Sequence, residues 1–263
     1  MATIIDPRSQ AGGDHRFFMI SALVMAAIVV LGFSFQLAMG RSTFAAPLLV
    51  HAHALLFMGW VGFYVLQNAL VATGSVALHK RLGWIGLAWM PAMVAMGVYT
   101  TLTMVRRGAA PFFFEPAYFL VMNSINVTVF AGLGIAAIMM RRRTDWHRRL
   151  HFCGMAFLIA PAFGRLLPMP LMIPWAGLGV FVAVLVLPFV GAARDLRRNG
   201  RVHPAWWWGI GTMALAQVAV TLIAYSGTGI AIYDAATAGY PGAAVAPLEF
   251  PPPPMGPLVT GGE

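Results

Sequence analysis

The sequence is poor in charge, in acidic residues and in cysteine. Only 10% of its 263 side chains are charged and 60% are hydrophobic, whereas about 25% of the residues of a soluble domain are charged. A chain of this length has too little interior to bury so much apolar surface, so part of its surface must face lipid. The single cysteine, Cys153, excludes an internal disulfide, and the Cys-x-x-Cys-His motif of covalent haem attachment is absent.

Other absences exclude or disfavour whole classes of protein. The only lysine, Lys80, lies in a predicted loop, which excludes a retinal Schiff base within the membrane. The His-Glu-x-x-His motif of zinc hydrolases is missing. No segment resembles a nucleotide-binding loop, and no Asp or Glu lies securely within a predicted span, so a proton-coupled pump is disfavoured.

What is present is a set of long apolar stretches. Seven of them reach the roughly 20 residues that a helix needs to cross a bilayer, and they show no strand-like alternation. The sequence therefore predicts an all-α polytopic membrane bundle of seven transmembrane helices, after a short tail over residues 1–16. The predicted spans are residues 17–39, 48–73, 83–105, 117–140, 150–167, 172–193 and 205–226.

The basic residues predict the orientation of these spans. Thirteen of the 17 Lys and Arg side chains fall in the segments that are cytoplasmic if the N-terminus is inside, three fall in outer loops, and Arg165 lies within a span. Cytoplasmic loops are enriched in Lys and Arg, so we expect a multi-pass protein of the bacterial inner membrane with its C-terminus outside. The net charge of +9 is interpreted as this topology signal plus attraction for anionic lipid, with no nucleic-acid partner.

The C-terminal segment, residues 227–263, is rich in Pro and Gly. It is expected to be extended and largely without regular structure on the outer side. Tyr233, Tyr240 and Phe250 make it less polar than most disordered tails, so the alternative is a tail that lies on its own bundle or on another subunit of a membrane complex.

A short repeat occupies two of the inner loops. The octet His79–Gly86 aligns with the octet His147–Gly154 as His-basic-Arg-Leu-x-aromatic-x-Gly. Each octet leads into a span, so the segments 48–105 and 117–167 are interpreted as parallel repeats about an axis along the membrane normal.

On these residues the chain resembles known membrane proteins. The segments His51–Phe57, His79–Gly83 and Asp145–Leu150, followed by Arg165, are similar to an uncharacterised family of bacterial multi-spanning membrane proteins over residues 48–167. Histidines near the ends of adjacent spans resemble, more distantly, di-haem b-type cytochromes of the cytochrome b561 kind. That resemblance implies haem between paired histidines, although the usual four histidines are not all present. The His-x-His span also resembles membrane proteins of the nitric-oxide response.

The candidate site residues follow from helical spacing. His51 and His53 point to nearly opposite sides of a helix, and His53 shares a seven-residue stripe with Trp60 and Gln67, so it is expected to face the bundle. His147 and His151 share a face because they are four residues apart. Arg165, five turns beyond His147, is expected on that same face, buried and paired; its alternative is to extend to the headgroups.

We predict that His79 meets His147 or His151 at the inner face. This group would ligate haem b, with Arg81 and Arg149 among the basic side chains that hold its propionates, or it would bind a quinone headgroup. His53 and Arg165 are further candidates for cofactor contacts, and His79, His147 and His151 are the candidate metal ligands. The function is thus expected to be that of a b-type-cytochrome-like or quinone-reactive electron-transfer protein. The alternatives are an accessory subunit and a transporter with helices broken at Pro91, Pro161 or Pro188.

Overall fold

The computed structural model describes residues 7–253 of the chain, with side chains from residue 13 onward. Between these limits the chain is helical and contains no strand. The long helices are α1 (Pro7–Ala38), α2 (Leu48–Ala72), α3 (Val76–Arg106), α4 (Pro116–Met139), α7 (Ala176–Asn199) and α8 (Pro204–Ala224). The shorter helices are α5 (Thr144–Leu158), α6 (Ala160–Leu166), α9 (Gly227–Thr237), η1 (Met169–Met172) and η2 (Pro241–Ala244).

Six helices are long and apolar enough to cross a membrane: α1, α2, α3, α4, α7 and α8. Their outward faces carry large apolar side chains, such as Leu215, Leu222 and Val182, each more than half exposed. A soluble monomer rarely exposes apolar surface on this scale. The chain is therefore a multi-pass membrane protein, as the composition predicts.

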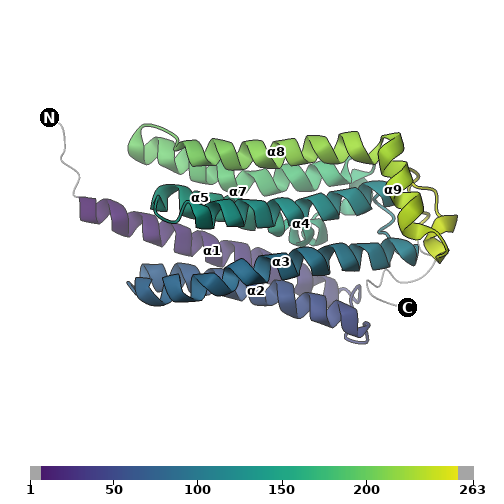
Figure 1. The fold of residues 1–263 in the computed structure, drawn as a ribbon, viewed down its shortest axis with the longest axis horizontal. Coiled ribbons are helices and arrows are strands. Elements are labelled where there is room, and N and C mark those ends of the chain that lie inside the picture. Colours follow the sequence, from purple (N-terminus) through teal and green to yellow (C-terminus); the bar gives the residue numbers. More distant parts are fainter. Residues whose placement is uncertain (1–6, 254–263) are drawn as a thin grey trace.

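The helices run up and down between two ends of the bundle (Figure 1). The start of α1 and the connections α2–α3, α4–α5 and α7–α8 lie at one end, which we call the basic end because it carries Lys80, Arg81, the run Arg141–Arg143 and the run Arg197–Arg201. The opposite end, which we call the α9 end, is covered by α9 and η2. Tight turns at the basic end use left-handed glycines, with φ of 82° at Gly74 and 67° at Gly200.

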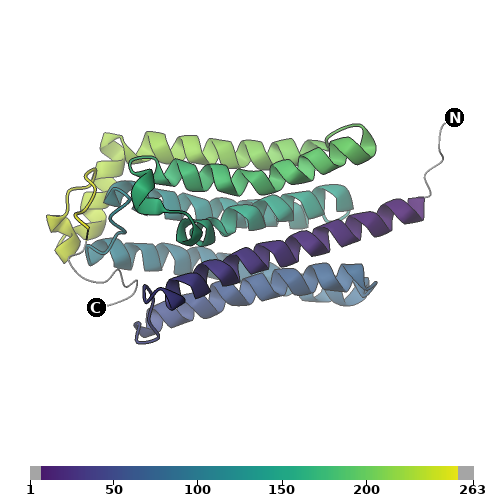
Figure 2. The same ribbon diagram turned by 180° about the vertical axis from the view of Figure 1, so that it is seen from behind.

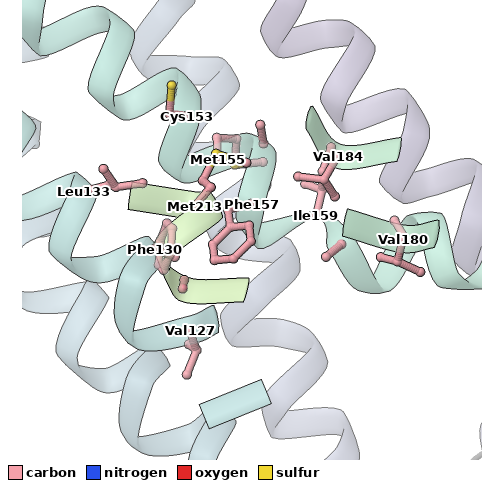
Figure 3. Close-up of a cluster of buried hydrophobic side chains, with 14 of the residues drawn as sticks. Val127, Phe130, Leu133, Cys153, Met155, Phe157, Ile159, Val180, Val184 and Met213 are labelled. Atoms are coloured by element: carbon pink, nitrogen blue, oxygen red, sulfur yellow. The ribbon is translucent and has the colours of Figure 1, made fainter. Parts of the chain in front are cut away.

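The core is centred on α4, which packs against α3 on one side and against α5 and α8 on the other. In the close-up, Phe130 of α4, Phe157 of α5 and Met213 of α8 gather around one point (Figure 3). Cys153 of α5 is fully buried nearby and lies against Gly209 of α8, where only a residue without a side chain fits. Aromatic and sulfur-containing side chains fill the interior between helices that face lipid on their other side.

The predicted fifth span is not one continuous helix. It is divided at Ile159 into α5 and α6, because Pro161 has no N–H to donate and its ring crowds the preceding turn. The short α6 packs beside α1, which crosses the face of the bundle obliquely (Figure 2). Pro91 and Pro188 lie inside α3 and α7, and both helices continue through them. Of the three prolines considered as interruptions, only Pro161 breaks a span.

The expectation of an extended C-terminal segment is wrong for residues 227–244, which form α9 and η2. Tyr233 is buried, and its hydroxyl donates to the carbonyl oxygen of Gly242 at 2.9 Å. Arg106 at the end of α3 donates to the carbonyl oxygen of Ala236, and the N–H of Ala117 in the first turn of α4 donates to that of Pro247. The segment therefore pairs polar groups that the ends of α3 and α4 would otherwise leave open. The predicted tail beyond residue 253 lies outside the described residues.

Candidate functional site

Three histidines from two helices lie together near the basic end. His79 is the fourth residue of α3, and His147 is the fourth residue of α5. The ring centroids of His79 and His147 are 6.1 Å apart, and those of His147 and His151 are 4.8 Å apart. Since α3 and α5 each pack along α4 and hardly touch each other, the imidazoles fill the space between these helices. The structure thus brings together the three residues that the repeated octets nominate.

Two hydrogen bonds set the orientation of the rings. His147 Nδ1 lies 2.8 Å from the carbonyl oxygen of Ala137, so this nitrogen carries the proton and donates. The second bond involves the side-chain amide of Gln67 in α2. In one orientation of this amide, its nitrogen donates to His79 Nδ1 at 2.8 Å and its oxygen accepts from the N–H of Gly83 at 3.1 Å. In this orientation of the amide, His79 Nδ1 is the acceptor and the proton of His79 resides on Nε2. The two neighbouring imidazoles then have opposite tautomers.

No hydrogen bond to a described residue is found for Nε2 of His147 or for either nitrogen of His151. His151 points toward α4, where the position of a Cβ on Gly134 would be 3.9 Å from its Cε1. The sulfur of Met90 fills the space that a Cβ on Gly134 would occupy. The cluster therefore presents one N–H donor, one bare nitrogen acceptor and a third imidazole one turn deeper.

The arginines nominated with the histidines lie elsewhere. Arg81 is exposed on the surface of α3, with no described ion pair. Arg149 is buried and makes a bidentate pair with Asp195 of α7, in which Nε and Nη2 each lie 2.8 Å from a carboxylate oxygen. Trp206 also donates to Asp195 at 2.9 Å, and Arg149 Nη1 donates to the carbonyl oxygen of Asp145. These bonds engage three of the five N–H groups of Arg149, so its role in holding cofactor propionates stays a prediction.

His53 and Arg165 lie toward the α9 end, away from the histidine cluster. His53 faces inward as expected and stacks on Phe57, with ring centroids 4.2 Å apart. Arg165 lies with its guanidinium 4.0 Å above the ring of Phe33. The expectation that Arg165 shares one stripe with His147 and His151 assumed an unbroken helix, and the break at Ile159 removes that basis.

No set of three or more His, Cys, Asp or Glu side chains is arranged around a possible metal ion in the described part of the chain. A metal site that uses all three histidines therefore remains a prediction. The shallow hollows that the structure describes also lie elsewhere. One lies over Trp207, Trp208 and Leu215 on α8, and the other lies between η1 and the start of α7, lined by residues 171–182.

Sequence reasoning missed three residues that shape this end of the bundle. Gln67 belongs to the inward stripe of α2, and its position one heptad after Trp60 was a usable signal. The sequence gives no indication that the carbonyl oxygen of Ala137 accepts from His147, because every residue has a carbonyl oxygen. Asp195, which is 1% exposed in α7, stands in a basic segment, and nothing in the sequence indicates that Arg149 reaches it.

No protein-family model, characterised protein or solved structure matches the chain.

Proposed function

We propose that this protein binds the headgroup of a lipid-soluble quinone at its basic end, between α3 and α5, and exchanges protons with it in electron transfer. The observation that carries this proposal is the pair of neighbouring imidazoles in opposite tautomers. A quinone carbonyl accepts one hydrogen bond, and a quinol hydroxyl donates one. His79 offers the N–H at Nε2, and His147 offers the bare nitrogen at Nε2.

The proton chemistry follows from these tautomers. In the quinone, the N–H of His79 polarises a carbonyl oxygen. In the quinol, His147 accepts one hydroxyl proton, the second proton leaves to the water at the basic end, and an external electron carrier removes the two electrons. The proton on Nδ1 of His147 is held by Ala137, so the charge that His147 gains is shared with a carbonyl dipole. The third imidazole, His151, lies within contact of His147 and suits a relay of that proton.

The surroundings suit such a ligand in two further ways. Lys80, Arg81 and the run Arg141–Arg143 favour the anionic forms that a quinone passes through on reduction. Next to His79, the lipid-facing side chains Leu78, Trp84 and Ile85 are each about half exposed. A ligand dissolved in the bilayer therefore meets apolar surface directly beside the imidazoles.

The binding test uses purified protein in lipid nanodiscs with a short-chain ubiquinone and measures quenching of tryptophan fluorescence. Loss of one neutral hydrogen bond costs about 0.5–1.5 kcal/mol. His79→Ala and His147→Ala should therefore each weaken binding about three- to tenfold. His51→Ala is the matched control, because His51 lies near the α9 end, where its ring contacts the carbonyl oxygen of Phe44. Equal affinity of all four proteins would refute the proposal.

Haem b ligated by His79 and His147 is the second candidate, favoured by the 6.1 Å separation of the rings across two helices that hardly touch. A haem ligand needs an unprotonated Nε2, and His147 already has this tautomer. His79 would have the same tautomer if the Gln67 amide turned, so that the amide oxygen accepted a hydrogen bond from His79 Nδ1. A low-spin b-type spectrum that is lost in His79→Ala and in His147→Ala would establish haem in place of quinone as the ligand of these rings.

For the topology, we infer seven passes, with α5 and α6 together forming the fifth, and a cytoplasmic basic end. The support is the segregation of Lys and Arg to the basic end and the position of α9 at the other end. A reporter active only outside the cytoplasm should give signal when it is fused after Glu263 and none when it is fused after Arg201. The reverse pattern would contradict this orientation, and signal from neither fusion would contradict the number of passes.

A further inference from the structure

A second set of polar side chains lies inside the half of the bundle nearer the α9 end. Five helices contribute one side chain each. Four of these side chains have a buried atom without a hydrogen-bond partner in the described chain: Oε1 of Gln36, Nδ1 of His53, Oγ1 of Thr100 and Oδ1 of Asn126. The fifth is the cation Arg165, which is partly exposed. Buried polar groups are normally paired, so this concentration of open ones requires an explanation.

Packing between α1 and α6 positions the cation. Gly32 of α1 lies so close to Ala162 that a Cβ would come within 2.8 Å of its carbonyl oxygen. This contact places the Arg165 guanidinium over Phe33, one residue from Gly32. Gln36 follows one turn later on α1, so it lies at a similar depth in the bundle.

Packing between α2, α3 and α4 positions the other groups. Gly97 of α3 faces both Phe57 and Val127, with a Cβ position 3.4 and 3.3 Å from their nearest atoms. His53 stacks on Phe57. Thr100 lies one turn beyond Gly97, and Asn126 directly precedes Val127 in the chain.

The two groups lie on helices that pack against one another, because α1 contacts both α6 and α2, and α3 contacts both α2 and α4. The hydroxyl of Thr100 also differs in its hydrogen bonding from those of the nearby threonines. Its neighbours Thr101 and Thr103 donate to the carbonyl oxygens of Gly97 and Tyr99, one turn back, and Thr100 does not. Its hydroxyl therefore remains available inside the bundle.

The charge of Arg165 has no counter-ion in the described chain. One of its N–H groups donates to the carbonyl oxygen of Pro161 at 2.9 Å, and the structure shows no carboxylate in contact with it. Glu115, the residue directly before α4, accepts from the Tyr225 hydroxyl. A cation among apolar helices is costly unless an anion or hydrogen-bond acceptors compensate it. The guanidinium thus keeps further donors for a ligand.

From this geometry we propose that the group Gln36, His53, Thr100, Asn126 and Arg165 binds a small hydroxylated carboxylate. A carboxylate matches the planar fork of a guanidinium and neutralises its charge. The open side-chain oxygens of Gln36 and Asn126 accept hydrogen bonds, so the ligand must also carry an O–H donor. A halide ion would compensate the charge and would leave those oxygens unpaired. This site is independent of the quinone proposed at the basic end.

The experiment compares lactate, propionate and chloride as sodium salts, with purified protein in nanodiscs. Lactate and propionate differ by the one hydroxyl that the open oxygens would use. We expect lactate to bind at least five times more tightly than propionate in calorimetry and to raise the melting temperature, and we expect chloride to have the smallest effect. Equal effects of the three salts, or none, would overturn the proposal.

Two variants connect the effect to these residues. Arg165→Gln should abolish the lactate effect, and Thr100→Val, which replaces only a hydroxyl by a methyl group, should reduce the preference for lactate over propionate. Thr100→Val keeps the test decisive if Arg165→Gln does not fold. Thr103→Val is the matched control and should retain the full lactate effect, because the Thr103 hydroxyl already donates to the carbonyl oxygen of Tyr99. A preference for lactate that persists in Thr100→Val and in Arg165→Gln would place the ligand elsewhere and refute the site.

Discussion

The buried pair of Arg149 and Asp195 provides a quantitative test of the packing at the basic end. Their side chains are 3% and 2% exposed, and two hydrogen bonds of 2.8 Å join them. Asp195→Asn preserves the shape and removes the negative charge, so the buried Arg149 keeps only its longer ion pair, at 3.6 Å, with the exposed Asp145. Breaking such a pair from one side costs about 3–5 kcal/mol, and we expect the free energy of unfolding to fall by that amount.

The double variant Arg149→Leu/Asp195→Leu separates charge from packing. Removing both charges should restore more than half of the stability lost in Asp195→Asn, because the cost of an uncompensated ion disappears. A residual loss of about 1–2 kcal/mol is expected, since the indole N–H of Trp206 loses its acceptor. Asp145→Asn is the surface control. Asp145 is 57% exposed and pairs with Arg148 and, at 3.6 Å, with Arg149, and such exposed pairs contribute about 0.2–1 kcal/mol.

The assay uses the only thiol of the chain. Cys153 is fully buried, so it reacts with a maleimide dye only when the bundle opens. Titration with SDS, followed by dye incorporation, gives the unfolding curve of each variant. If Asp195→Asn unfolds at the wild-type SDS concentration, or if the double variant is less stable than the single one, the pair is not the stabilising ion pair described above. Arg149 would then again be available for a ligand.

Two further predictions concern the contacts of α8. Gly209→Ala would place a methyl group on Cys153 and should destabilise the bundle by about 1–3 kcal/mol in a thermal melt, whereas Gly211→Ala on the same helix, where no atom lies within 4 Å, should melt like the wild type. His203 caps α8 by accepting from the N–H of Ala205 at 3.1 Å, and burial, together with the charge of Arg149, lowers the pKa of His203 below its usual value of about 6.5. The neutral ring is therefore favoured in the fold, so the capping contribution is complete above pH 6.5 and is lost as the pH falls below it. His203→Asn, which keeps an acceptor at this position, should show less acid destabilisation than the wild type between pH 7.5 and 5, and an unchanged pH dependence would contradict the cap.

Local properties of the chain allowed the membrane class and most of the helices to be predicted from the sequence. An apolar run of about 20 residues forms a helix in lipid wherever it stands, because every backbone polar group must then be paired within the segment. Six predicted spans correspond to continuous helices for this reason. The two octets, from their spacing, nominated His79, His147 and His151, and the seven-residue stripe indicated that His53 faces inward.

Only the tertiary structure decided which groups meet. Arg149 and Arg81 look equivalent in the two octets, yet one lies inside the bundle opposite Asp195 and the other remains on the surface. Pro161 breaks its helix, whereas Pro91 and Pro188 do not. The tautomer of His79 depends on an amide from another helix. Each of these outcomes depends on contacts between segments far apart in the chain, and such contacts leave no periodic pattern in the sequence.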